Sequence, residues 1–309
     1  MAEIAILLNP VADNGKASRK QKQLEFILGS HDVSYRLFVS ESEAHLRKLV
    51  KDIPTEYHTI VGAGGDGTFN IIVNELMIQK LDNRFAMIPL GSQNDIAREF
   101  GVDSLEDACY ALRIRKTVQV DLGVITADKQ EPMYFLGTAS LGLGTTVNKF
   151  VEEVIQKYPY LANFKQFVGL VGCNNSFSKE EVPLHITLNY GEIIDGGKFS
   201  LVVFNNTRFY AGGLKPSPNA KPDDSYLDCC YIKNDNFWQF LWLLFLARNE
   251  ILHPNARAKT IPAHQFRIRS NDNIEIQADG QILGAYKDIT LAVKSKALSV
   301  IVNPKYSEN

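Results

Sequence analysis

The sequence predicts an α/β N-terminal domain with a parallel sheet, followed by a β-rich, sandwich-like second domain. Two observations predict this fold class. Short apolar runs alternate with helical segments over residues 1–125, which is typical of parallel strands joined by helices. From residue 126 onward, strand-like runs follow one another with few helical segments between them, which indicates antiparallel strands.

The expected elements follow from apolar periodicity, taken in chain order. The first domain should span 1–125 and regain a C-terminal return at about 296–309, leaving 126–295 to the second domain. Its strands are expected near 3–8, 33–39, 57–62 and 85–89, and its helices near 17–29, 42–52, 68–79 and 104–114. The second domain should hold strands near 132–139, 182–190, 199–205, 226–233, 265–270, 273–278 and 288–293, and helices near 145–157 and 236–248.

Composition narrows the class of protein. The 309 residues carry 33 basic and 35 acidic side chains, a net charge of −2, so no nucleic-acid partner is expected. The four cysteines have irregular spacing, which favours free thiols in a reducing compartment. The first residues lack a basic segment and are expected to form a strand rather than a signal peptide, so we expect a cytoplasmic location.

The most apolar stretch, residues 237–247, is shorter than the about 20 residues that a membrane span needs. A buried helix is the simpler interpretation. Its residues Trp238 and Trp242 also fit a helix beside a lipid-binding cleft or at a membrane surface, because Trp favours interfaces.

The most informative motif is Gly64-Gly65-Asp66-Gly67-Thr68, which lies between a strand-like and a helix-like run. Glycines let the backbone approach a ligand closely, and a helix N-terminus adds N–H donors and partial positive charge. Together they predict a phosphate site. A bare carboxylate repels phosphate, so Asp66 indicates a divalent cation between the two.

Two further polar loops should lie at the same edge of the sheet, because ligands bind beyond the carboxyl ends of parallel strands. One loop, residues 9–15, begins with Asn9, which could hold nucleotide or belong to an ordinary turn. The other contains Ser92, Asn94 and Asp95. Ser92 or Asn94 could simply cap the next helix, or Ser92 could donate to phosphate while Asn94 and Asp95 orient it or its metal.

These motifs, taken in order, resemble the diacylglycerol kinase catalytic domain, and are closest to the bacterial soluble lipid kinases of that family. The resemblance covers about nine-tenths of the chain and rests on an ordered set of segments. They are 64–68 with Asn70, 91–95 with 97–98, 120–123, 139–142, 211–213, 218–224 with 227–228, and 279–280.

The resemblance implies ATP and Mg²⁺ as cofactors, with Asp66 helping to hold the catalytic Mg²⁺. Together with the loops above, it gives a nucleotide-binding set of Asn9, Ser40, Gly64, Gly65, Asp66, Gly67, Thr68, Asn70, Ser92, Asn94 and Asp95. It also implies a structural Mg²⁺ site in the second domain, formed by the carbonyls of Lys221 and Tyr226 and the carboxylate of Asp224. The family's usual Gly at position 225 is Ser here.

One position departs from the family pattern. The family has Asp-Gly-Glu, with the Glu proposed as base, where this chain reads Asp279-Gly280-Gln281. An amide cannot act as a general base near neutral pH. Asp279 could replace it, the transfer could proceed without a strong base, or the chain could be a weak or inactive relative that binds nucleotide and lipid.

The resemblance implies transfer of the γ-phosphoryl group of ATP to the hydroxyl of a lipid such as diacylglycerol, with transient contact at the inner membrane face. It leaves a homodimer as an option. An NAD kinase is the enzymatic alternative, because it shares the glycine motif, but the later Thr- and Ser-rich stretch of those enzymes is missing from the sequence.

Overall fold

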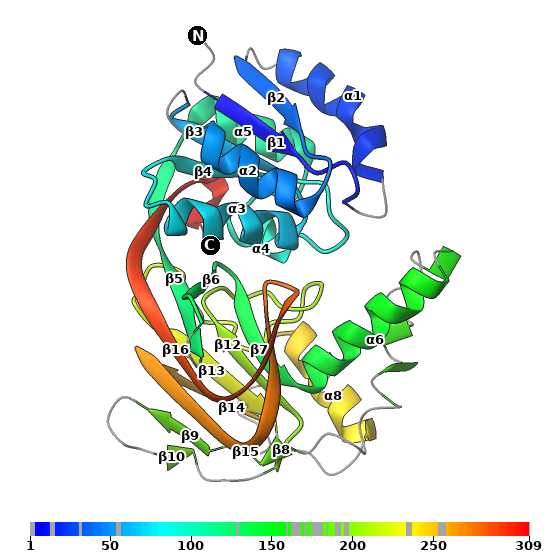
Figure 1. The fold of residues 1–309 in the computed structure, drawn as a ribbon, viewed down its shortest axis with the longest axis vertical. Coiled ribbons are helices and arrows are strands. Elements are labelled where there is room, and N and C mark those ends of the chain that lie inside the picture. Colours follow the sequence, from blue (N-terminus) through cyan, green and yellow to red (C-terminus); the bar gives the residue numbers. More distant parts are fainter. Residues whose placement is uncertain are drawn as a thin grey trace.

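The computed structural model describes residues 4–308 apart from short segments. The segments outside the described residues are 13–15, 31–32, 54–56, 128–129, 159, 162–167, 170, 173, 175–181, 184, 189–192, 195–197, 233–236 and 253–257. Two lobes lie one above the other, with the C-terminus near the level where they meet (Figure 1).

The first lobe is a parallel sheet with helices packed on it, as the sequence predicts. Its strands run in the order β4-β3-β1-β2. They are β1 (Ile4–Leu8), β2 (Tyr35–Val39), β3 (Thr59–Gly64) and β4 (Arg84–Pro89). The helices are α1 (Lys16–Ser30), α2 (Glu43–Asp52), α3 (Asp66–Ile78), α4 (Asp95–Glu99) and α5 (Leu105–Ile114).

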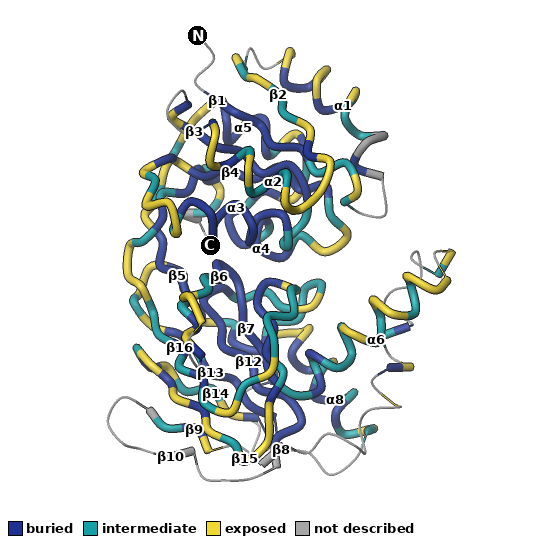
Figure 2. The backbone as a smooth tube through the Cα atoms, in the orientation of Figure 1, coloured by how far each residue is buried: buried dark blue, intermediate teal, exposed yellow. Residues whose placement is uncertain are grey.

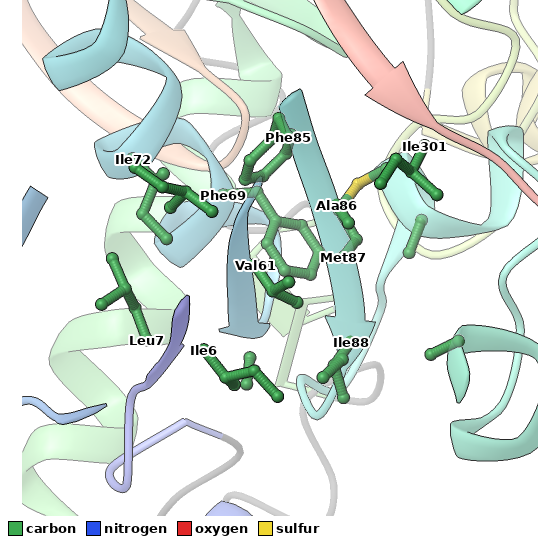
Figure 3. Packing of buried hydrophobic residues seen from close by; sticks show 14 of the residues in the cluster. Ile6, Leu7, Val61, Phe69, Ile72, Phe85, Ala86, Met87, Ile88 and Ile301 are labelled. Carbon is green, nitrogen blue, oxygen red and sulfur yellow. The ribbon is translucent and has the colours of Figure 1, made fainter. Parts of the chain in front are cut away.

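The hydrophobic core of this lobe packs α3 against β3 and β4. This packing positions the loops that follow these two strands. Phe69 of α3 stacks edge to face with Phe85 of β4 at 6.2 Å, and Val61 of β3 belongs to the same buried cluster (Figure 3). Strands buried on both faces read as continuous apolar runs, which is why β1 and β3 were visible in the sequence.

The second lobe is β-rich. Its main strands are β5 (Thr117–Ala127), β6 (Met133–Phe135), β7 (Thr138–Gly142), β9 (His185–Leu188), β12 (Leu201–Asn205), β13 (Leu227–Ile232), β14 (Ala258–Ala263), β15 (Gln265–Ala278) and β16 (Gln281–Ile301). Short strands are β8 (Val182–Pro183), β10 (Ile193–Ile194) and β11 (Lys198–Phe199). Helices α6 (Leu143–Lys157) and α8 (Phe237–Arg248) lie on one side of this lobe (Figure 1).

One sheet runs through both lobes. β16 pairs with β15 in the second lobe and continues upward until Val300 pairs in parallel with Phe85 of β4 (Figure 1). β5 runs antiparallel to β16 along most of this path, from Thr117 opposite Ile301 to Ala127 opposite Ile289. The C-terminal strand therefore belongs to both lobes.

Several elements differ from expectation. The segments expected at 265–270 and 273–278 form a single strand, β15, with a register shift between Arg269 and Ile274. The segment expected at 288–293 is part of the much longer β16, and the one expected at 132–139 is divided into β6 and β7. β5, β14 and α4 were not predicted.

Dark buried backbone fills both lobes, and exposed positions concentrate on α1, α2, α6 and the outer loops (Figure 2). No helix in the described part of the chain is long and apolar enough to span a membrane.

Candidate functional site

A cleft of about 1030 Å³ lies between the lobes and takes its walls from both. The first lobe contributes the loops after β1, β2, β3 and β4, and the second lobe contributes β7, α6, α8 and the β15–β16 turn. Of the expected nucleotide-binding residues, those that line it are Asn9, Ser40, Gly65, Asp66, Gly67, Thr68, Ser92 and Asp95. The carboxyl ends of the parallel strands thus meet at the cleft, as such sheets require.

The two glycine loops lie against each other. A Cβ on Gly91 would stand 2.5 Å from the Cα of Gly65, and one on Gly64 would stand 2.4 Å from Oγ1 of Thr68. Only glycine fits at such approaches, which explains why both loops carry it. Gly65 is the N-cap of α3 and makes no side-chain cap bond, so the helix N-terminus opens directly on the cleft.

Asp66 connects the two glycine loops. Its Oδ2 accepts from the amide of Asp95 at 3.1 Å and its Oδ1 accepts from the amide of Ile96 at 3.1 Å, so it holds the start of α4. Burial, followed by repulsion from Asp95, raises the pKa of Asp66 to about 7. A cation beside this carboxylate would offset both effects, so the donor chemistry fits Mg²⁺.

Asp95 extends this acidic pair toward the second lobe. Its Oδ2 accepts from the amide of Gly212 at 2.6 Å, and its Oδ1 from Arg98 at 3.3 Å. Burial raises the pKa of Asp95, and the bond from the Gly212 amide opposes the shift. The carboxylate therefore ties the second glycine loop to the 210–214 turn of the other lobe.

The first loop is joined to the glycine motif by side chains. Asn9 Nδ2 donates to Oγ1 of Thr68 at 2.9 Å, so two cleft residues position each other. Ser40 is buried and its hydroxyl donates to the carbonyl of Leu8 at 3.2 Å, at the end of β1. Residues 13–15 of this loop lie outside the described residues.

Three expected site residues stand behind the cleft wall. Gly64, Asn70 and Asn94 are not among the cleft-lining residues. Asn94 has φ +54° and bonds Gly91 in both directions, accepting from its amide at 2.9 Å and donating to its carbonyl at 2.8 Å. It therefore shapes the loop. Asn94 occupies the N-cap position of α4, as one alternative had it, but its side chain makes no cap bond.

Asp279 lies at the junction of the lobes. Its Oδ2 accepts from Asn70 at 3.0 Å and from the amide of Leu136 at 2.9 Å, and its Oδ1 from the amides of Gly137 at 2.9 Å and Thr138 at 3.0 Å. Burial raises its pKa, and these bonds, with Asn70 first, oppose the shift. Four donors occupy the carboxylate, which favours a structural role over that of a general base.

Gln281 follows the two-residue turn formed by Asp279 and Gly280, whose φ values are both positive, +47° and +80°. Its Nε2 lies 3.4 Å from the carbonyl of Gly67, so the side chain reaches from the second lobe to the glycine motif. The position where the family has Glu therefore faces the glycine motif.

The expected structural metal site lies apart from the cleft. Oδ1 of Asp224 accepts from the amide of Tyr226 at 2.9 Å, and Asp121 accepts from the amide of Ser225 at 2.6 Å. Burial, then Asp121 and Asp223, raises the pKa of Asp224. The neighbouring carboxylates of Asp224 and Asp121 would suit a hard cation, and the carbonyls of Lys221 and Tyr226 as further ligands stay a prediction. No group of three His, Cys, Asp or Glu side chains within the described residues is placed to hold a metal.

The backbone conformation at Ser225 explains why the family usually has glycine at this position. Its φ is +67°, in the left-handed region where side chains are strained and glycine is favoured.

Several cleft residues could not be recognised from the sequence. They are Ser140, Asn148, Phe209, Tyr210, Arg248 and Gln277, which come from five separate segments of the second lobe. Only the fold brings them to one wall. Ser140 lay in a segment that carried the resemblance, but without an assigned role.

Comparisons with known families match two segments of the chain. Residues 3–125 match the diacylglycerol kinase catalytic domain, and residues 137–302 match the YegS C-terminal NAD kinase beta sandwich-like domain. The second match alone covers more than half of the chain.

Similar proteins were found by sequence and by structure. A Bacillus subtilis protein named "Putative lipid kinase YtlR" is 26% identical over 92% of this chain and 94% of its own. A Staphylococcus epidermidis diacylglycerol kinase is 27% identical over 75% of this chain and 70% of its own. Two solved structures share the fold and cover 99% of this chain. One is a Bacillus anthracis diacylglycerol kinase (TM-score 0.72, 19% identity, 98% of that chain), and the other an Archaeoglobus fulgidus NAD kinase in complex with ATP (TM-score 0.53, 13% identity, 96% of that chain).

The raised pKa of Asp66 predicts a pH-dependent stability. Between the usual carboxyl pKa of 3.8 and about 7, the folded metal-free protein holds a proton that the unfolded chain has released. Its free energy of unfolding should therefore fall as pH rises through this window, by at most about 1.4 kcal/mol per pH unit. Urea unfolding at pH 5, 6, 7 and 8 measures this, with Asp66→Asn as comparison. Equal pH slopes for both proteins would contradict the prediction.

Proposed function

The chain belongs to the diacylglycerol kinase catalytic domain family, of the bacterial soluble lipid kinase type, and from that premise we propose that it transfers the γ-phosphoryl group of ATP to the hydroxyl of diacylglycerol or a related lipid. One observation carries the proposal. The two glycine loops and Asp66 stand at one end of a cleft whose second-lobe wall includes the apolar side chains of α6. A phosphate-binding end and an apolar wall are what phosphorylation of a lipid requires.

Different residues of the chain would bind the phosphates, hold the metal and exclude water. Amides at the start of α3 meet the phosphates, and the hydroxyls of Thr68 and Ser92 add donors at the same loops. Asp66 would hold Mg²⁺, which supplies charge neutralisation between the phosphate oxygens when it is bound. The lobes enclose the reacting groups and limit the access of water.

Transfer without a strong base fits the contacts of the site. Gln281 carries an amide, and the carboxylate of Asp279 is held by four N–H donors. Phosphoryl transfer depends chiefly on alignment and charge stabilisation, so such a site can act, at a reduced rate. We place the reaction at the inner membrane face, in the cytoplasm.

The proposal is tested by a transfer assay with radiolabelled ATP. Purified protein is offered diacylglycerol, monoacylglycerol, a sphingoid base, phosphatidylglycerol and NAD, each with and without Mg²⁺. We expect Mg²⁺-dependent labelling of a lipid, and a loss of at least about 100-fold in Asp66→Asn because charge stabilisation at the phosphates is removed.

Three results would contradict it. They are faster labelling of NAD than of any lipid, undiminished lipid labelling by a folded Asp66→Asn protein, and stabilisation by ATP with no labelled acceptor at all. The first would indicate an NAD kinase, and the third a nucleotide-binding relative without activity.

Gln281→Glu should raise the rate of lipid phosphorylation. The carboxylate would face the phosphate loop from the position that now lies 3.4 Å from the carbonyl of Gly67, where it could accept a proton. General-base assistance contributes about 10²–10⁴-fold when it is fully developed, so we expect a rise of at least tenfold in kcat. Gln119→Glu adds the same charge at an exposed site far along β5 and is the control. No rise relative to wild type would reject the idea that position 281 limits turnover.

We further propose that α8 makes the transient membrane contact. Trp238, Trp242 and Phe245 are 77%, 58% and 52% exposed, whereas Leu244 and Arg248 of the same helix line the cleft. The aromatic face thus stands beside the cleft, where a bilayer would present the lipid.

Changing both tryptophans to Ser should weaken sedimentation with phosphatidylglycerol vesicles and lower the rate on vesicle-borne lipid, while activity on a dissolved short-chain lipid is kept. Phe26→Ser removes an aromatic residue of equal exposure, 77%, from α1 and is the matched control. Equal vesicle binding by all three proteins would contradict this contact.

A further inference from the structure

A cluster of polar side chains lies on the second-lobe wall of the cleft and has no role in the reaction described above. Its members are Ser140 of β7, Asn148 of α6, Tyr210 in the segment after β12, and Gln277 of β15. We call these four residues the polar cluster. All four line the cleft, and Ser140 and Gln277 are otherwise buried.

Hydrogen bonds hold the polar cluster together around Gln277. Its Nε2 donates to Oγ of Ser140 at 2.8 Å and lies 3.5 Å from the hydroxyl of Tyr210, while its Oε1 accepts from Nδ2 of Asn148 at 2.9 Å. The hydroxyls of Ser140 and Tyr210 are 3.2 Å apart. The four side chains therefore have fixed positions, as a binding site needs.

The polar cluster is connected to the phosphate end of the cleft. Nδ2 of Asn148 also donates to the carbonyl of Gly280 at 2.9 Å, and the next residue, Gln281, reaches the carbonyl of Gly67. A continuous line of polar groups thus runs from the glycine motif across the turn to α6. A molecule whose hydroxyl lies at the phosphate loop would place its neighbouring atoms along this line.

An apolar stripe on α6 lies beside the polar cluster, and Glu152 and Gln156 of the same helix also line the cleft. Val147, Val151 and Ile155 recur at every fourth position of α6, and all three line the cleft. The stripe extends about 12 Å along the helix at 1.5 Å per residue. Its start is next to Asn148, so polar and apolar surfaces meet within one helical turn.

The polar cluster can both donate and accept. Nδ2 of Asn148 donates to Gln277 and to Gly280. Its Oδ1 has no hydrogen-bond partner within the described residues. The hydroxyls of Ser140 and Tyr210 stand beside it.

We propose that the polar cluster binds the polar backbone of the acceptor lipid, meaning the ester carbonyls and any second hydroxyl next to the hydroxyl that is phosphorylated. One acyl chain then lies along the apolar stripe of α6. This inference rests on the proposed lipid kinase function and assigns the residues that distinguish one acceptor from another. A plain long-chain alcohol, which has no such backbone, makes no bond to the polar cluster and is a poor substrate.

The test compares two acceptors that share a primary hydroxyl and an alkyl chain. Monodecanoylglycerol carries the glycerol backbone, and 1-dodecanol lacks it. Two cluster variants, Tyr210→Phe and Ser140→Ala, each remove one hydroxyl and keep the shape of the wall. The matched control is Ser299→Ala, which removes a hydroxyl bonded to Gln119 on the outer surface.

For wild type and for Ser299→Ala, we expect kcat/KM for monodecanoylglycerol to exceed that for 1-dodecanol by at least about 30-fold. Losing one hydrogen bond to the backbone should raise the KM for monodecanoylglycerol by about tenfold in each cluster variant. The KM for ATP and kcat/KM for 1-dodecanol should stay within twofold, which a general distortion of the fold would not allow.

Equal losses with both acceptors would overturn the inference and leave the kinase function standing. So would an unchanged KM for monodecanoylglycerol in both cluster variants. If the wild type phosphorylates neither acceptor, the proposed function fails first, and titration of dioctanoylglycerol into the ATP-bound protein decides the inference. Binding weakened by about tenfold in Tyr210→Phe supports the lipid site, and equal binding rejects it.

Discussion

The geometry of the cleft depends on the carboxylate of Asp279. Its two oxygens accept from Asn70 on α3 and from three consecutive amides that lead into β7, so one side chain joins α3 of the first lobe to the second lobe. The group is buried, and leaving any of its donors unpaired would be costly. The β15–β16 turn is held in place by the same bonds, and with it the position of Gln281 above the glycine motif. The aspartate thus links the two walls of the cleft directly.

The sequence revealed the first lobe more completely than the second, for a physical reason. Parallel strands buried on both faces are apolar throughout, so β1 and β3 are visible without any knowledge of their partners. β5 was missed because Asp121 and Gly123 interrupt its pattern. Asp121 is nevertheless fully buried, because its carboxylate accepts from the amides of Ser225 and Lys296, residues more than a hundred positions away. Such partners cannot be inferred from neighbouring residues.

β14 was missed for a related reason, since it contains Pro262, which argues against a strand. The strand order places β14 at the edge of the sheet, where a proline costs no ladder bond. The fold class was nonetheless predicted correctly, and the family comparisons and structural neighbours confirm it.

The site could be predicted from the sequence as a set of loops, but not as a set of contacts. The glycine motif and Ser92 were recognisable because steric need and helix-terminus chemistry act over a few residues. The polar residues that line the cleft could not be recognised in the same way. Asn94 shapes a loop, whereas Gln277, which was not singled out in the sequence, reaches the cleft. The side of a wall on which a side chain stands is decided by the register of distant strands.

The strand shared between the lobes has a consequence for folding. β16 pairs with β15 at one end and reaches β4 at the other, so neither lobe can complete its sheet while the other is unfolded. Heat or denaturant should therefore melt the chain as a single cooperative unit, despite its three separate hydrophobic clusters. Any molecule that occupies the cleft would then raise the melting temperature of the whole protein, because both halves share one transition.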